Sequence, residues 1–195
     1  CSSDLGGWDP FEIAVRAVLG QPITVQAATR LAGRMVAAIG TRIEDAAVMP
    51  GLTHAFPRPH RFDLKTLSGL GMTRARAAAI AGIAAAAIAD PRLFDPRRDL
   101  SQAVARLCEL PGIGQWTAQY IAMRALGESD AFLAGDVAIQ RQFHRSERRA
   151  SASELLAHAE RWRPWRAYAM MHLWMADADA AKTQLKKETY HALSA

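Results

Sequence analysis

The sequence has few of the residues from which metal sites and disulfide frameworks are built. Its 195 residues include two cysteines, Cys1 and Cys108, too few for a four-cysteine zinc or iron–sulfur site. The six histidines show no HExxH or similar ligand spacing. These shortages argue against a metal site made of side chains, and they indicate a reducing, intracellular compartment.

Long apolar runs are also missing. The longest, AAIAGIAAAAIA, is mostly alanine and is shorter than the roughly 20 residues that a membrane helix needs. No signal peptide is recognisable. The first residue is cysteine rather than methionine, as in a chain from which an N-terminal part has been removed. We therefore expect a cytoplasmic protein without a membrane span.

The composition is that of a folded, moderately basic protein. Half of the residues are hydrophobic, which excludes a disordered chain, and the length suffices for one large domain or two small lobes. Lys and Arg number 24 against 19 Asp and Glu, a formal charge of +5. That excess is compatible with a polyanionic partner and equally with a basic surface that binds none.

Apolar spacing predicts helix after helix, and no convincing strand alternation. Asp9 is placed to cap a helix that starts at Pro10 and ends at Gly20, and Thr24 to cap one that ends at Gly40. Three prolines in residues 50–62 predict a loop, a candidate division between two lobes. Further helices are expected in DLKTLSGLG, in TRARAAAIAGIAAAAIAD up to Pro91, in PRRDLSQAVARLCEL, and from about Gln115, Asp136, Ser151, Pro164 and Lys182. The expected class is all-α, with a site in a cleft between helical lobes.

One glycine turn has the features of an anion site. In LPGIGQWTAQYIAMR, Gly112 and Gly114 lie between one helix and the next, so backbone N–H groups and the positive helix end converge there. Such a point binds a phosphate without reading sequence, and Thr117 is placed to add a hydroxyl contact. A tight helix–helix turn without a ligand has the same local sequence, so both interpretations stay open.

The wider sequence resembles the helix-hairpin-helix DNA glycosylase superfamily, and within it 3-methyladenine DNA glycosylase II, the AlkA type. The resemblance covers residues 8–180 and lies in FEIAVRAVLGQ, LSGLGMTRARAAAI, LPGIGQWTA, FLAGD and RWRPWRAYAMMHLWM, in the family's order. It implies a glycosylase domain over residues 1–195 with two helical lobes, the active site between them, and a hairpin at about 99–126. It also implies hydrolytic release of flipped, alkylated bases from duplex DNA.

Asp136 occupies the place of the family's catalytic carboxylate. Breaking the bond between base and deoxyribose develops positive charge on the sugar, which a nearby carboxylate stabilises. At about 4 Å and an effective dielectric of about 20 this is worth roughly 4 kcal/mol, on the order of a thousandfold in rate. The local sequence alone also fits a simple helix cap, and the two roles can coexist.

Trp116 stands where the bifunctional members carry a lysine that cleaves the strand through a Schiff base. The resemblance therefore implies a monofunctional enzyme that uses water. Trp116, Tyr120 and Trp174 correspond to the aromatic lining of the base pocket, whose faces attract positively charged purines. Tyr120 and Trp174, taken alone, fit the hydrophobic core equally well. Trp162 and Trp165 are interpreted as packing or backbone-contact residues.

LGQPIT matches the tip that enters the minor groove. Pro22 replaces the family's usual leucine, and either Pro22 or Ile23 is the expected wedge, with Gln21 facing the opposite strand. The plain alternative is a proline between two helices. A second departure is Gly135, where a close relative has another acidic residue.

The resemblance implies no required cofactor. A monovalent cation, Na⁺ or K⁺, bound at the family's hairpin by backbone oxygens would here use Cys108, Leu110 and Ile113. Expected partners are double-stranded DNA with alkylated bases and no membrane, for a monomer associated with the nucleoid. The rival hypothesis is a non-catalytic DNA-binding module. An iron–sulfur lyase conflicts with Trp116 and with the few cysteines. The preferred lesion, and whether a β-rich or alkyl-transfer domain precedes the chain, stay open.

Overall fold

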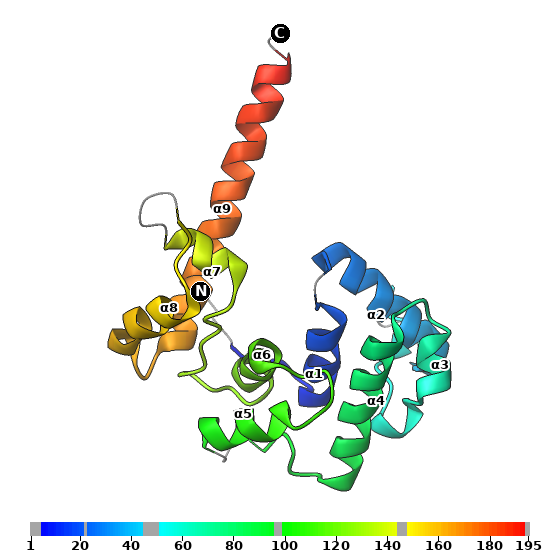
Figure 1. The fold of residues 1–195 in the computed structure, drawn as a ribbon. Coiled ribbons are helices and arrows are strands. Elements are labelled where there is room, and N and C mark those ends of the chain that lie inside the picture. Colours follow the sequence, from blue (N-terminus) through cyan, green and yellow to red (C-terminus); the bar gives the residue numbers. More distant parts are fainter. Residues whose placement is uncertain (1–4, 22, 45–50, 96–98, 144–147, 194–195) are drawn as a thin grey trace. The chain divides into compact units, whose positions relative to one another are not determined.

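Helices dominate the computed structural model, which confirms the all-α class (Figure 1). The structure describes residues 5–21, 23–44, 51–95, 99–143 and 148–193, and for 181–193 the backbone alone. Within these ranges the chain divides into two compact units. One is Gly6–Gly127, and the other combines Leu5 with the residues from Glu128 onward.

The first unit begins with the two helices that the capping signals predict. The Asp9 carboxylate accepts hydrogen bonds from the N–H groups of Phe11 and Glu12, and Pro10 is the first helical residue. The Thr24 hydroxyl caps the second helix through the N–H of Ala27. The described helices of this unit are α1 Pro10–Leu19, α2 Val25–Ile39, α3 Leu64–Ser68, α4 Arg74–Ala89, α5 Leu100–Cys108 and α6 Gln115–Ala125.

The proline-rich segment does not divide the units, so that prediction is wrong. From residue 51 onward it lies inside the first unit, where β2 His54–Ala55 pairs antiparallel with β1 Thr41–Arg42 and is followed by the 3-10 turn η1 Pro59–Arg61. Phe56 and Phe62 then pack on Phe11 of α1, with ring centroids 6.3 and 5.1 Å away. Aromatic burial holds the loop against the helices. Strands of two residues are too short to show an alternating pattern.

The turn between α5 and α6 lies directly on α4. Gly112 has a φ of +81°, in the left-handed region that glycine adopts freely. A Cβ on Gly112 would come within 2.7 Å of the Cβ of Ala79 on α4. The turn can approach this closely because Gly112 has no side chain and Ala79 has a small one. In the interior of the unit, α1 packs against both α4 and α6 (Figure 1).

The second unit consists of two shorter helices, a 3-10 turn and one long helix. Its elements are α7 Val137–Gln142, α8 Ala152–Ala159, the 3-10 turn η2 Glu160–Trp162 and α9 Arg166–Leu193. The separate helix expected from Lys182 is wrong, because α9 continues through that position for 28 residues and extends past α7 and α8 (Figure 1). No glycine or proline interrupts Arg166–Leu193, and alanine, leucine and methionine favour a continuous helix there.

A buried arginine anchors the start of α9. The side chain of Arg166 is only 8% exposed. Its guanidinium donates from Nε to Asp130 Oδ1 at 2.8 Å and from Nη2 to the Asp130 backbone carbonyl at 2.8 Å. The N–H of Ala167 also donates to the Ser129 carbonyl at 2.9 Å. Paired with a carboxylate in this way, the buried charge is compensated. The segment that precedes Asp136 is thereby fixed to α9.

Gly112→Ala should destabilise the fold. The left-handed backbone is unfavourable for alanine, and the new Cβ would overlap Ala79, so we expect the free energy of unfolding to fall by about 2 kcal/mol. Denaturant unfolding followed by circular dichroism measures this change.

Gly82→Ala is the matched control. Gly82 lies within α4, and a Cβ there would meet no heavy atom of the described chain within 4 Å. The same substitution should therefore raise the free energy of unfolding by about 0.5–1 kcal/mol. An equal, small effect of both substitutions would mean that the hairpin turn tolerates a side chain.

Candidate active site

Asp136 lies at the N-terminus of α7, where one of its carboxylate oxygens receives three donors. Its Oδ1 accepts from the N–H groups of Ala138 at 3.0 Å and Ile139 at 3.2 Å, so Asp136 is the helix cap. The indole Nε1–H of Trp174 on α9 donates to the same oxygen at 3.1 Å. The carboxylate is half-buried and orientated by both helices. Two of the predicted site residues, Asp136 and Trp174, therefore meet within the second unit.

An ion pair holds α7 against α9 beside this contact. Arg141 donates to both oxygens of Asp177, at 3.1 Å from Nε and 2.7 Å from Nη2, and Gln142 donates to Asp177 Oδ1 at 3.1 Å. The hydrogen bond from Arg141 lowers the pKa of Asp177 below its ordinary value. Asp177 follows Trp174 by three residues and so shares its face of α9. The pair helps to place the Trp174 indole over the helix end that carries Asp136.

Gly135 is not required by packing. A Cβ at this position would meet no heavy atom of the described chain within 4 Å, and its φ is not in the left-handed region. A side chain would therefore fit beside Asp136. The absence of a second acidic residue here is a difference in chemistry and not a consequence of limited space.

Trp116 and Tyr120 form an aromatic pair on α6 in the first unit. Their rings stack with centroids 5.4 Å apart and an interplanar angle of 13°. Both rings are half-buried and neither belongs to the fully buried core. Tyr120 also lines a cavity of about 210 Å³ together with Ile23 and with residues of α1 and α2. One predicted pocket residue and one predicted wedge residue thus border the same hollow.

The turn between α1 and α2 contacts the hairpin through Gln21. Its Nε2 donates to Thr117 Oγ1 at 2.9 Å and to the Gly112 carbonyl at 3.1 Å. Thr117 is buried at 4% exposure, so its hydroxyl serves this internal contact. The predicted DNA contacts of Gln21 and Thr117 stay predictions. Pro22, the first candidate wedge, lies outside the described residues, and Ile23 is half-buried.

The hairpin presents the first turn of α6 without a side-chain cap. Gly114 is the capping residue, in an extended conformation, and as a glycine it makes no side-chain hydrogen bond to the first turn of the helix. N–H groups at the N-terminus of a helix are donors that can bind a phosphate. Of the three carbonyls predicted to bind a monovalent cation, those of Cys108, Leu110 and Ile113, that of Leu110 accepts from the N–H of Ile113 at 3.1 Å. Since a carbonyl has two lone pairs, this bond still permits a cation.

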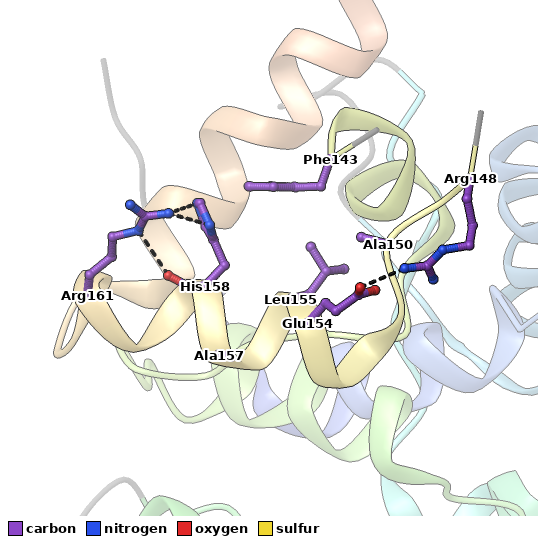
Figure 2. Close-up of a pocket in the computed structure, with 8 residues that line it drawn as sticks. All are labelled: Phe143, Arg148, Ala150, Glu154, Leu155, Ala157, His158 and Arg161. Atoms are coloured by element: carbon purple, nitrogen blue, oxygen red, sulfur yellow. Dashed lines mark hydrogen bonds and ion pairs between the residues drawn. The ribbon is translucent and has the colours of Figure 1, made fainter. Parts of the chain in front are cut away.

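A larger hollow lies in the second unit, and Asp136 is not among the residues that line it. It has a volume of about 440 Å³ and is bordered by the Phe143 ring and by α8 with its flanking segments (Figure 2). Within it Arg148 pairs with Glu154 at 2.6 Å, and Arg161 contacts His158, as the dashed lines in Figure 2 show. None of the predicted site residues lines it. Nearby, Trp162 packs on Phe132, Phe143 and His158.

The chain is similar in sequence to glycosylases of alkylated DNA. It is 37% identical over 172 residues to DNA-3-methyladenine glycosylase 2 of Escherichia coli (strain K12). The matched residues cover 87% of this chain and 58% of that relative. It is 39% identical over 166 residues to the probable bifunctional transcriptional activator/DNA repair enzyme AlkA of Mycobacterium tuberculosis (strain ATCC 25618 / H37Rv), covering 85% of this chain and 33% of that relative. The chain belongs to the helix-hairpin-helix DNA glycosylase superfamily.

The solved structures agree with this assignment. The 3-methyladenine DNA-glycosylase from Archaeoglobus fulgidus superposes with a TM-score of 0.72 at 25% identity, over 87% of this chain and 58% of that one. The 8-oxoguanine glycosylase/lyase of Clostridium acetobutylicum, at 13% identity and a TM-score of 0.76 over 89% of this chain and 61% of that one, shares the fold alone. No protein-family model matches the chain.

The match extends over only part of these glycosylases. The chain spans about a third of the length of the mycobacterial relative and 58% of the Escherichia coli relative. Within the described residues no helix is long and apolar enough to cross a bilayer, and no cluster of three His, Cys, Asp or Glu side chains is placed to hold a metal ion.

The Arg141–Asp177 pair predicts a dependence of stability on pH. Because the folded-state pKa of Asp177 is lowered, its contribution is present above the unfolded-state value of about 3.9 and is lost as the pH falls through the lower folded value. The pair is partly exposed, so we expect a contribution of about 1 kcal/mol or less.

Denaturant unfolding at pH 7 and near pH 3, with Asp177→Asn beside the parent, measures this contribution. The variant should be less stable than the parent at pH 7, and the difference should shrink near pH 3. A constant difference at both pH values would show that the ionised pair does not cause it.

Proposed function

We propose that this chain carries the catalytic apparatus of a monofunctional DNA glycosylase, which flips alkylated purines out of duplex DNA and releases them by hydrolysis. The observation that supports this most directly is the Asp136 carboxylate, fixed at the start of α7 by two backbone N–H groups and the Trp174 indole. The substrate class follows the names of the relatives, which are DNA-3-methyladenine glycosylases.

In this mechanism Asp136 acts on the sugar. As the bond to the base breaks, the deoxyribose gains positive charge, and the carboxylate stabilises that charge. The three donors on Oδ1 limit rotation of the carboxylate, so its negative charge need not reorganise during the reaction. The same carboxylate orientates or deprotonates the attacking water. No lysine is needed for this route.

The aromatic residues recognise the base. The stacked rings of Trp116 and Tyr120 offer an aromatic face to a flipped purine, and Trp174 adds another ring beside Asp136. Alkylated purines carry positive charge, and a cation over an aromatic face gains about 0.5–2 kcal/mol. Stacking alone discriminates weakly between related bases, so we propose a broad range of alkylated purines and not one lesion.

The hairpin and the wedge turn bind the DNA itself. In this proposal the N–H groups at Gly112, Gly114 and the start of α6 hold a phosphate without reading sequence. The turn that carries Gln21 and Ile23 fills the space that the base leaves. The partner is double-stranded DNA, which places the protein at the nucleoid in the cytoplasm. The alternative is a non-catalytic binding module that uses the hairpin alone.

Asp136→Asn should abolish base release while the protein still folds and binds DNA. Asparagine is as good a helix cap as aspartate and accepts the same hydrogen bonds, so the substitution removes charge with little change in structure. We expect single-turnover release of methylated purines to fall by about a thousandfold at saturating enzyme. Activity within a few-fold of the parent would favour the non-catalytic module.

Trp174→Phe is the companion variant. It keeps the carboxylate and an aromatic ring but removes the N–H that donates to Asp136. A loss smaller than that of Asp136→Asn, about tenfold, is expected if the indole orientates the carboxylate. Asp136→Ala should in addition lower the free energy of unfolding by about 1 kcal/mol, since it removes the cap.

The products should include an abasic site in an uncut strand. Trp116 stands where a Schiff-base lysine would be, so no amine in that position attacks the sugar. Reduction with borohydride during the reaction should therefore trap no covalent protein–DNA complex, and gels should show nicks only after alkali treatment. A strong trapped band would mean that another amine acts as the nucleophile.

A further inference from the structure

The turn between α1 and α2 is held from two sides. The side chain of Gln21 donates to Gly112 and Thr117 of the hairpin, at 3.1 and 2.9 Å. The backbone carbonyl of the same residue accepts from Nη2 of Arg76, on α4, at 2.7 Å. Gln21 thus joins segments that lie 55 and 91 positions away in the sequence. These contacts fix the backbone immediately before the proposed wedge.

One face of α4 supports both turns. Arg76 and Ala79 are three residues apart, so they lie on the same side of the helix. Arg76 reaches the turn that carries Gln21, while Ala79 is the residue against which Gly112 packs, with 2.7 Å between its Cβ and a Cβ built on the glycine. A single rigid helix therefore sets the distance between the wedge turn and the hairpin.

The environment of Arg76 is unfavourable for stability. Its Nε is buried and has no hydrogen-bond partner within the described structure. Burying a donor of a charged group without an acceptor destabilises a fold, and an apolar side chain of similar length would avoid that penalty. The contact that Arg76 does make is the directional bond to the Gln21 carbonyl. The Arg76 side chain therefore serves to position the turn that carries Gln21, and does not serve to stabilise the fold.

We propose that Arg76 is a positioning residue for base flipping, which fixes the wedge turn relative to the phosphate-binding hairpin. This inference rests on the proposed glycosylase function. A wedge keeps a gap in the base stack open only if it keeps its position in the DNA. Its turn must therefore be fixed relative to a second part of the protein that binds the same DNA. Arg76, Gln21 and α4 connect the wedge turn to the hairpin, which is that second part. Without the guanidinium, the wedge turn can move away from the base stack of an intact duplex.

The test compares Arg76→Met and Arg76→Lys with the parent. Arg92→Met is the control, because it removes the same charge from an exposed position just beyond the C-terminal end of α4. Single-turnover release of a methylated purine is measured at saturating enzyme, once in intact duplex and once with the lesion opposite an abasic site. A 2-aminopurine beside the lesion reports unstacking, and thermal denaturation reports stability.

For Arg76→Met we expect a loss of about tenfold on intact duplex, with a smaller rise in 2-aminopurine fluorescence, as misplacement of a positioning group produces. On the abasic-site duplex, where the stack is already open, release should stay within about twofold of the parent. The melting temperature should be unchanged or higher. Arg76→Lys should recover part of the loss, and Arg92→Met should match the parent in the ratio of the two rates.

Three results would overturn the assignment. One is an unchanged rate of Arg76→Met on intact duplex. Another is an equal loss on both substrates accompanied by a lower melting temperature, which a purely structural residue gives. The last is a parent that produces no 2-aminopurine signal. If instead the parent unstacks the duplex without releasing any base, the proposed chemistry fails, and the fluorescence of the variants still decides the role of Arg76.

Discussion

The close approach of the hairpin turn to α4 is the constraint on which the first unit depends. Gly112 can lie on Ala79 only because its left-handed backbone carries no side chain. At this distance the Gly112 carbonyl accepts a hydrogen bond from the side-chain amide of Gln21. The same amide donates to the hydroxyl of the buried Thr117. The contacts between the hairpin, the turn that carries Gln21, and α4 therefore all depend on the close approach of Gly112 to Ala79. A larger residue at position 79 or 112 would alter them together.

In the second unit, the main feature is a carboxylate, that of Asp136, held at the N-terminal end of a helix. The backbone of α7 supplies two donors to Asp136, and α9 supplies a third from Trp174. The position of Trp174 depends in turn on the packing of α7 against α9, which the Arg141–Asp177 pair strengthens, and on the buried Arg166 that fixes the start of α9 to Asp130. The proposed catalytic group is therefore orientated by contacts spread along the whole unit.

Local signals predicted the elements well, because capping chemistry and glycine turns act over a few residues. Asp9, Thr24 and Asp136 all cap the helices expected of them. The helix start predicted near Lys182 was wrong, because no glycine or proline precedes it to end the helix and α9 continues through that position. The proline-rich segment looked like a boundary because its sequence does not show that Phe56 and Phe62 pack on Phe11.

The contacts within the candidate site were not predictable in the same way. The family resemblance indicated Asp136 and Trp174 separately, but their hydrogen bond joins positions 38 residues apart. The role proposed for Arg76 was not predicted, since it is one of two arginines in TRARAAAI and nothing in the local sequence distinguishes it. Which donor meets which acceptor is decided by packing over long sequence separations.

The dual place of Asp136, as helix cap and proposed catalyst, has a consequence for genetic variation. Most replacements at this position remove the cap, and a weakened protein is open to degradation. Asparagine keeps the side-chain cap, and its codons differ from those of aspartate by one nucleotide. The most accessible stable variant would then be a protein that still occupies damaged DNA and does not repair it. In a cell that also makes the active form, such a variant would compete for lesions and shield them, a more harmful outcome than simple loss of the gene.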